Sequence, residues 1–220
     1  MAGIRFDVRE REGLRMEQLE AYNRTFLSKA ELVKKLSHLL EPEDYNKVIA
    51  AYEMAEDIHL FQSRRDNTPY FFHVTRIGKI IMNELNIIDA EIFCGAFLHD
   101  ALEDSDVLNL ETLTYNFGPY ISYIVDVLTR FHRLKVEKES DKNLDAYLHR
   151  LRNSSIDCVI IKLAERLDNM RCLPYGLKVN PMQYIEETFQ YYIPLAMHFN
   201  HPAIEKLIQL IRLEKTKYFN

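Results

Sequence analysis

Histidines and carboxylates that can bind a metal occur at three separate places in the chain. His73 comes first, the pair His99-Asp100 follows, and Glu165 lies at the third place. Imidazole nitrogens and carboxylate oxygens in these proportions suit a single divalent cation that activates water. If the four side chains converge in space, they predict a metal-dependent hydrolase. If they do not, the chain says little about its chemistry.

Two further carboxylates, Glu103 and Asp104, follow His99-Asp100 by one helical turn. Residues four apart share a helix face, so we expect His99 to stack with Glu103 and Asp100 with Asp104. The preceding run, Ile92–Leu98, is apolar nearly all round and predicts a buried helix. Ionisable groups beside a buried segment are costly to desolvate and repel one another unless a cation is present. The alternative is an exposed acidic helix end with one capped histidine.

Glu165 lies within Ile160–Met170, where the apolar residues predict a substantially buried helix. Asp168, three residues later, is a second candidate ligand or a partner of a ligand. Taken alone, Glu165 also fits half of a surface ion pair, and His73 fits an ordinary histidine on an amphipathic helix. The buried setting of Glu165 favours the metal site.

The rest of the pattern predicts an α-helical protein. Glycine and proline are few, at 6 and 7 of 220 residues, and apolar residues recur at helical spacing. Asp89 is a suitable helix N-cap, and the stretches 63–69 and 132–142 are expected to be loops. We expect helices over residues 16–40 with a break at Asn23 or Ser28, then over 43–62, 70–85, 90–98, 112–117, 120–130, 143–152, 156–170, 182–199 and 202–217.

We divide the chain into three parts. Residues 1–42 form a helical extension, residues 43–200 form the catalytic domain, and residues 201–220 form a C-terminal helix packed on that domain. The extension either packs across the core or mediates self-association, so a homo-oligomer is compatible with the sequence.

Composition excludes several classes of protein. The net charge of −5 and the pI near 5.9 argue against a nucleic-acid partner, which needs a basic surface. No apolar run approaches the ~18 residues of a membrane span, and no signal peptide begins the chain. Cys94, Cys158 and Cys172 form no CxxC pair, which indicates reduced thiols in a cytoplasmic protein. Cys94 and Cys158 lie in apolar stretches and are expected in the core.

Three segments together resemble the HD phosphohydrolase superfamily, and within it the hydrolase domain of RelA/SpoT-type alarmone enzymes. They contain RxxxxPYxxH, HDxxED and KLAERLDNMR, and a later stretch resembles the closing helix of the family: Arg64–His73, Ala96–Asp106, Lys162–Arg171 and Glu187–Ala196. An HD pair alone is weak evidence, but the combination is specific. The resemblance covers roughly residues 45–200 and implies an all-α, HD-domain helical bundle.

The resemblance also implies a ligand set. His73, His99 and Asp100 match three metal ligands of the family, and Glu165 stands where a fourth, an aspartate, is expected. The metal of that branch is usually Mn²⁺, and another divalent metal would suit the same ligands. The pair after the HD motif, Glu103 and Asp104, matches the carboxylates that activate water and support the transition state.

Substrate contacts are implied in the same way. Arg64 matches a residue that packs on the guanine base, and Asn169 matches one that contacts the nucleotide. Arg65 either neutralises phosphate or belongs to a solvated basic loop. Cys172 replaces a frequent threonine near the base pocket. Asn67 stands where the family often has glycine, and asparagine tolerates the left-handed backbone that such a turn needs.

The implied reaction removes pyrophosphate from the 3′ position of guanosine tetra- or pentaphosphate and yields GDP or GTP. Because only one more helix fits after Ala196, we expect a stand-alone small hydrolase without a nucleotide-synthesising domain. Departures from the family at Glu165, Asp168 (for a frequent histidine) and Cys172 leave two alternatives open. One is an HD phosphohydrolase that acts on another nucleotide, and the other is a catalytically impaired nucleotide-binding module.

Overall fold

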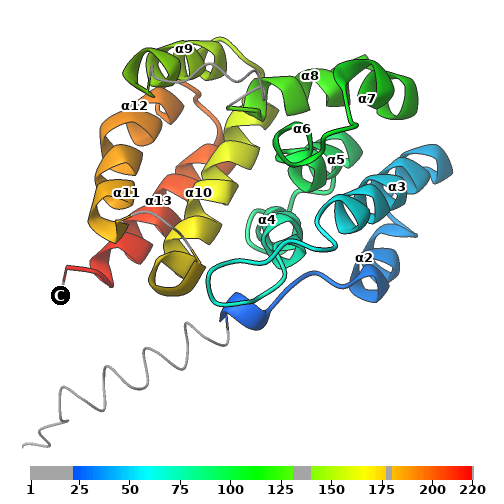
Figure 1. The fold of residues 1–220 in the computed structure, drawn as a ribbon, viewed down its shortest axis with the longest axis horizontal. Helices are drawn as coiled ribbons and strands as arrows, with labels where there is room; N and C mark the ends of the chain where they lie inside the picture. The colour runs from blue at the N-terminus through cyan, green and yellow to red at the C-terminus, as the bar shows by residue number, and fades with distance from the viewer. Residues whose placement is uncertain (1–21, 131–139, 177–179, 220) are drawn as a thin grey trace, which may run out of the picture.

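The computed structural model describes residues 22–130, 140–176 and 180–219. Over these ranges the secondary structure is helical, and the β-type pairing is limited to one isolated bridge between Ser63 and Pro69. The predicted all-α fold is therefore confirmed. The elements of Figure 1 are α2 (Lys29–Leu36), α3 (Pro42–Ile58), α4 (Phe71–Asn83), α5 (Ala90–Leu98), α6 (Ala101–Asp104), α7 (Leu110–Phe117), α8 (Pro119–Leu128), α9 (Ser140–Arg152), α10 (Ile156–Gly176), α11 (Pro181–Glu187), the π-helix η1 (Thr188–Tyr192), α12 (Ile193–Ala196) and α13 (Pro202–Thr216).

Short polar residues determine where several helices begin. Ser28, one of the two predicted breaks, caps α2 and forms a reciprocal capping box with Glu31. Asp89 caps α5 as predicted, since its Oδ1 accepts a hydrogen bond from the Ile92 amide at 2.9 Å. Proline occupies the first turn of α3, α8, α11 and α13, where its missing N–H costs nothing.

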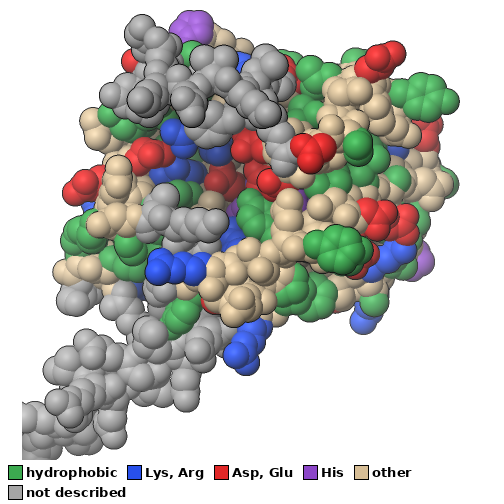
Figure 2. Space-filling model, in the orientation of Figure 1, with side chains coloured by type: hydrophobic (Ala, Val, Ile, Leu, Met, Phe, Trp, Pro, Cys, Tyr) green, Lys and Arg blue, Asp and Glu red, His purple; other side chains and the backbone are tan. Residues whose placement is uncertain are grey.

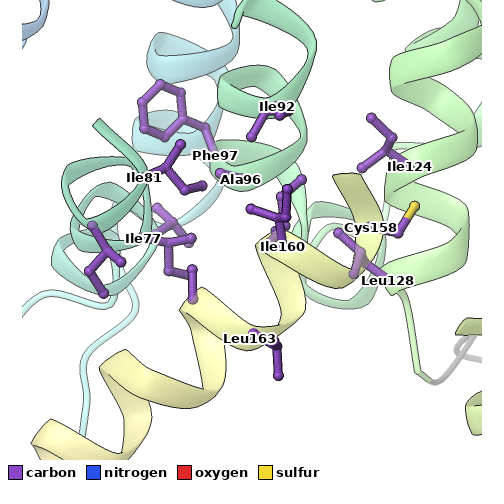
Figure 3. Close-up of a cluster of buried hydrophobic side chains, with 14 of the residues drawn as sticks. Ile77, Ile81, Ile92, Ala96, Phe97, Ile124, Leu128, Cys158, Ile160 and Leu163 are labelled. Atoms are coloured by element: carbon purple, nitrogen blue, oxygen red, sulfur yellow. The ribbon is translucent and has the colours of Figure 1, made fainter. Parts of the chain in front are cut away.

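Helix α10 lies at the centre of the bundle. It packs against α4, α5 and α8 on one side and against α11 and α13 on the other. Apolar side chains from four helices meet between them: Ile77 and Ile81 of α4, Phe97 of α5, Ile124 and Leu128 of α8, and Ile160 and Leu163 of α10 (Figure 3). Cys94 and Cys158 are fully buried in this core, as predicted. None of the described helices is long and apolar enough to cross a bilayer.

The helix predicted over residues 90–98 is confirmed as α5, but the helical geometry expected from His99 to Asp104 is interrupted. α5 ends at Leu98, His99 and Asp100 form a turn, and α6 is a single turn of four residues. The interruption follows from local hydrogen bonds, because the Asp100 carbonyl accepts the amides of both Glu103 and Asp104. The side chains of His99 and Asp100 therefore leave the backbone from a turn and not from a straight helix.

The single helix predicted over residues 182–199 is also divided. A π-helical turn, η1, separates α11 from α12, and the Ile193 amide bonds to the carbonyl of Thr188, five residues back. Pro194 has no N–H to donate to the preceding turn, which favours this wider register. The expected loop over 132–142 lies mostly outside the described residues, as does the region 1–21, and α9 begins at Ser140. The division into three domains stays a prediction.

Gly95 allows α5 to approach its neighbours closely. A Cβ atom there would lie 2.6 Å from Cγ2 of Ile124 and 2.9 Å from Cδ1 of Ile161. Overpacking of this kind costs about 1–3 kcal/mol, more than the ~1 kcal/mol that alanine gains over glycine in a helix. Gly95→Ala is therefore expected to lower the free energy of unfolding, measured by urea titration with circular dichroism. A more stable variant would show that Ile124 moves aside without cost.

Candidate metal centre

Three of the four predicted ligands converge. One ligand atom from each of His73, His99 and Asp100 lies within 4.8 Å of the others. In the part of the chain that the structure describes, these residues form a group of three side chains that could hold a metal ion. His73 comes from the first turn of α4, and His99 and Asp100 come from the turn after α5. The two imidazole rings meet edge to face with their centroids 5.4 Å apart.

Both imidazoles are held so that Nε2 is left for a ligand. His99 donates from Nδ1 to the Ala96 carbonyl at 2.8 Å, and His73 donates from Nδ1 to Oδ2 of Asp168 at 2.7 Å. Nε2 of His99 is buried without a hydrogen bond and lies 3.0 Å from Oδ2 of Asp100. Metal-binding histidines commonly anchor the second ring nitrogen to a carbonyl or a carboxylate in this way. The residues present therefore fit a divalent cation.

The charge states of the cluster residues also fit a divalent cation. Burial opposes ionisation of Asp100, but His99 and a 2.6 Å hydrogen bond from Tyr70 hold the pKa of its carboxyl well below its usual range. Burial and the Arg64 guanidinium lower the pKa of His73 to about 4, so this ring is neutral. Burial also disfavours the charged form of His99, yet Asp100 raises its pKa to about 9. A bound cation would displace the His99 proton.

Asp168 binds Nδ1 of His73, the ring nitrogen that is not left for a metal. It is fully buried and accepts two hydrogen bonds at each oxygen. Oδ2 accepts from His73 and from Arg76 Nη2 at 3.1 Å, and Oδ1 accepts from Arg76 Nε at 2.7 Å and from the Tyr22 hydroxyl at 2.8 Å. Burial raises the pKa of this carboxyl, but Arg76 and His73 hold it well below its usual range. Of the two roles expected for Asp168, this geometry supports partner of a ligand.

Arg76 was missed by the sequence reasoning. It lies three residues after His73 on the amphipathic helix α4, and its side chain is almost wholly buried. An arginine on the buried face of an amphipathic helix needs an internal carboxylate, and that requirement is the signal that could have revealed the Asp168 pair.

Glu165 stays outside the three-residue cluster. Its Oε1 accepts a hydrogen bond from Asn169 at 2.8 Å, and its Oε2 forms an ion pair with Lys162. Burial raises the pKa of its carboxyl, but Lys162 and then His99 lower it, and the net direction is downward. Glu165 is therefore ionised and electrostatically close to His99, while its role as the fourth ligand stays a prediction.

Arg64 lies buried beside the cluster. Its Nη2 donates to Oδ1 of Asn169 at 2.8 Å, and its guanidinium lies 5.6 Å from the centroid of the Tyr70 ring. Its Nε and Nη1 are buried and make no hydrogen bond. A buried guanidinium with two unbonded donors can bind an anion or a nucleobase edge. Arg64 and Asn169, each predicted to contact the nucleotide, thus lie side by side, and their contact with substrate stays a prediction.

The other predicted substrate residues differ in their exposure. Asn67 has φ of 64°, the left-handed conformation that the sequence predicted for this turn. Arg65 is exposed at the same turn. Cys172 is fully buried and accepts a hydrogen bond from Arg76 Nη2 at 3.4 Å, so it lies on the Asp168 side of His73. Its contact with a base stays a prediction.

Glu103 and Asp104 lie at the edge of the site. Glu103 Oε1 accepts a hydrogen bond from the Arg130 amide, and Oδ2 of Asp104 lies 3.6 Å from Nδ1 of His59. His59, which the sequence reasoning did not single out, is buried, and its ring centroid lies 5.0 Å from that of Tyr70. Figure 2 shows acidic and basic side chains gathered around a hollow near the middle of this face.

The HD domain family model matches residues 51–199, more than half of the chain. This chain belongs to the HD domain family. Among curated relatives of this HD domain protein, guanosine-3′,5′-bis(diphosphate) 3′-pyrophosphohydrolase of Aquifex aeolicus is 30% identical over 168 residues, covering 76% of this chain and 23% of the relative. GTP pyrophosphokinase of Streptomyces coelicolor is 27% identical over 183 residues, covering 83% of this chain and 21% of the relative.

A solved structure, described as a metazoan orthologue of SpoT that hydrolyses ppGpp, matches with a TM-score of 0.64 and 28% identity. The match covers 76% of this chain and 94% of that one. The resemblance to RelA/SpoT-type enzymes is thereby confirmed. The chain spans about a fifth of the length of the curated relatives it matches, and their names include both hydrolases and synthetases.

Removal of the Asp168 charge tests the buried pair. Asp168→Asn leaves Arg76 buried without a counter-charge, so we expect a loss of about 3 kcal/mol in the free energy of unfolding at pH 7. Because the folded-state pKa of Asp168 is depressed, the charged carboxylate contributes to the free energy of unfolding above the unfolded pKa near 4. This contribution is lost as the pH falls through the folded-state pKa. The difference in the free energy of unfolding between Asp168→Asn and the parent protein should therefore become smaller below about pH 4.

The measurement is urea unfolding from pH 8 to pH 3 in the presence of a chelator. Asp157→Asn is the matched control, since Asp157 accepts a hydrogen bond from Tyr120 at 2.7 Å but contacts no buried arginine. It should cost less than about 1.5 kcal/mol. A pH-independent difference between Asp168→Asn and the parent protein would contradict the depressed pKa.

Proposed function

We propose that this HD domain protein removes pyrophosphate from the 3′ position of guanosine tetra- or pentaphosphate, with Mn²⁺ as the metal. The observation that carries the proposal is the convergence of His73, His99 and Asp100, each with a ligand atom available, beside the buried and incompletely bonded Arg64. The hydrolase name of the Aquifex relative, and the solved structure that the chain nearly spans, support hydrolysis over synthesis.

In this proposal a divalent cation held by His73, His99, Asp100 and Glu165 supplies Lewis-acid activation of water and of a phosphoryl oxygen. Asp168 fixes the orientation of His73, and Tyr70 fixes that of Asp100. Such outer partners set the geometry and basicity of ligands.

Glu103 and Asp104 act as bases at the rim of the site. Both are partly exposed, so a proton taken from water can leave to solvent. Placement of one carboxylate within reach of the attacking water contributes typically about 10²–10⁴-fold to such reactions. His59, 3.6 Å from Asp104, can hold that carboxylate in place.

Basic side chains near the cluster suit a substrate with several phosphates. Arg64 offers two donors that make no hydrogen bond, and Lys162, whose side chain is 12% exposed, forms an ion pair with Glu165. Arg166 is fixed between the rings of Tyr184 and Tyr192, at 3.8 and 4.2 Å, and bonds to Glu187, so it serves the framework. Arg64 and Lys162 are therefore the cations that we assign to substrate.

One observation supports an alternative. In the structure Lys162 neutralises Glu165. If Glu165 stays paired with Lys162 and does not bind the metal, the site has three ligands. Such a protein would be a nucleotide-binding module of low activity, or would act on another nucleotide.

The deciding experiment is turnover of guanosine tetraphosphate by the purified protein, with added Mn²⁺ and with chelator, following GDP and pyrophosphate. We expect release of intact pyrophosphate that needs the metal, and its loss in His73→Ala together with loss of Mn²⁺ binding. Glu103→Gln should bind Mn²⁺ but turn over at least about 10²-fold more slowly. A fully active His73→Ala protein would overturn the proposal. Cleavage of other nucleotides alone would favour the alternative substrate.

The role of Glu165 can be tested by two substitutions. Glu165→Asp keeps a carboxylate but shortens it by about 1.5 Å, whereas Glu165→Gln removes the charge. If Glu165 is a ligand, Glu165→Gln should weaken Mn²⁺ binding by more than the ~10–100-fold typical of outer partners, and Glu165→Asp should bind better than Glu165→Gln. Calorimetric titration with Mn²⁺ gives the affinities. Equal Mn²⁺ affinity in Glu165→Gln and the parent protein would show that this carboxylate serves Lys162 alone.

A further inference from the structure

The segment ahead of α2 crosses the side of the molecule behind His73. We call residues 22–27 the strap; in Figure 1 it passes below α4 before the chain turns into α2. The Tyr22 hydroxyl donates to Oδ1 of Asp168 at 2.8 Å. Arg76 Nη1 donates to the carbonyls of Asn23 at 2.9 Å and Thr25 at 3.1 Å. The strap therefore contacts both members of the buried pair that holds His73.

The strap is firmly seated along its length. The ring of Phe26 stacks on Phe72 with a centroid distance of 4.4 Å, and Lys79 donates to the Phe26 carbonyl at 3.2 Å. Leu27 is buried, and its carbonyl accepts the hydroxyl of Tyr52 at 3.0 Å. These contacts fix Tyr22 at the start of the strap as a rigid donor.

A second contact reaches the other half of the site. The buried side chain of Asn23 donates from Nδ2 to Oδ2 of Asp66 at 2.7 Å. Oδ1 of Asp66 accepts the amide of Thr68 at 3.1 Å and its hydroxyl at 2.7 Å, which closes the turn that follows Arg64. The strap thus touches the supports of both the candidate ligands and the candidate substrate arginine.

The Tyr22 hydroxyl completes the set of donors around Asp168. Oδ2 of that carboxylate accepts from the ring of His73 and from Arg76 Nη2 at 3.1 Å, while Oδ1 accepts from Arg76 Nε and from Tyr22. Loss of the tyrosine hydroxyl leaves Oδ1 with Arg76 Nε alone, so one of the four hydrogen bonds that hold the carboxylate toward His73 is lost. Orientation of a ligand by such partners strongly affects metal affinity.

We propose that Tyr22 is a positioning residue of the metal centre, which acts on His73 through Asp168, and that the strap is part of the functional site. The proposal rests on the metal site of the proposed function and is independent of the substrate. Residues 22–27 lie outside the segment matched by the HD domain model, which begins at residue 51.

The test compares Tyr22→Phe with the parent protein in full-length form. Mn²⁺ affinity is measured by calorimetry, and the Co²⁺-loaded absorption spectrum reports ligand geometry without any substrate. We expect Mn²⁺ binding about 10-fold weaker and a shifted Co²⁺ spectrum. Tyr120→Phe is the matched control, because it also removes a tyrosine hydroxyl that donates to a carboxylate, that of Asp157 at 2.7 Å, away from His73. Tyr120→Phe should keep the parent affinity and spectrum.

Urea unfolding of both metal-free variants separates this role from general destabilisation. If Tyr22→Phe and Tyr120→Phe lose similar stability but only Tyr22→Phe loses affinity, the positioning role is established. Unchanged Mn²⁺ affinity and Co²⁺ spectrum in Tyr22→Phe would refute it. Should Tyr22→Phe fail to fold, Tyr22→Trp, which keeps a ring and an N–H donor, must bind Mn²⁺ more tightly than Tyr22→Leu, and equal affinities would refute the role. A parent protein that binds no Mn²⁺ or Co²⁺ would instead refute the metal site itself.

Discussion

The buried ion pair between Asp168 and Arg76 is the interaction on which the site depends. Two charges removed from water carry a desolvation penalty that their attraction offsets only when the remaining donors and acceptors are also bound. Here His73, Tyr22 and two backbone carbonyls complete that bonding. The pair joins α4, α10 and the strap, and it fixes the ring of the first candidate ligand. Structural support and ligand orientation are therefore one network.

Close helix packing brings the second and third ligands to the same place. Gly95 lets α5 lie against α8 and α10, and Gly78 of α4 faces the ring of Phe97, where an added Cβ would be 2.6 Å away. The end of α5 is consequently held at a short distance from the first turn of α4. The turn at His99-Asp100 then places a ligand atom of both side chains near His73.

Much of this arrangement could be predicted from sequence because it rests on local rules. Helical periodicity located the main helices, the capping preference of Asp89 located the start of α5, and the turn at Asn67 followed from the tolerance of asparagine for positive φ. The pattern of ligand types identified His73, His99 and Asp100. These features depend on residues near in sequence, or on a motif long enough to be specific.

Other features were beyond the sequence because they depend on distant partners. The donors to Asp168 come from residues 22, 73 and 76, and no spacing rule joins them. Likewise, the sequence does not say which cation pairs with Glu165. The partner is Lys162, whereas Arg171 is bound to Glu84 at 2.6 Å. The π-turn η1 arises from Pro194 within an otherwise regular helix. Competition among several partners decides such contacts.

The strap has a consequence for how this protein can change over generations. Arg76 and Asp168 are each tolerable in the core only while the other is present, and Tyr22 adds one donor to the pair. A histidine at position 168, common at that place in the resembling enzymes, would leave Arg76 buried without its counter-charge unless the arginine had already been replaced. Accepted mutations at positions 76 and 168 are therefore constrained in their order. A descendant that loses the strap would leave Arg76 Nη1 without the carbonyls of Asn23 and Thr25, so two proteins of this fold could share every metal-binding residue and still differ in the N-terminal segment that they tolerate.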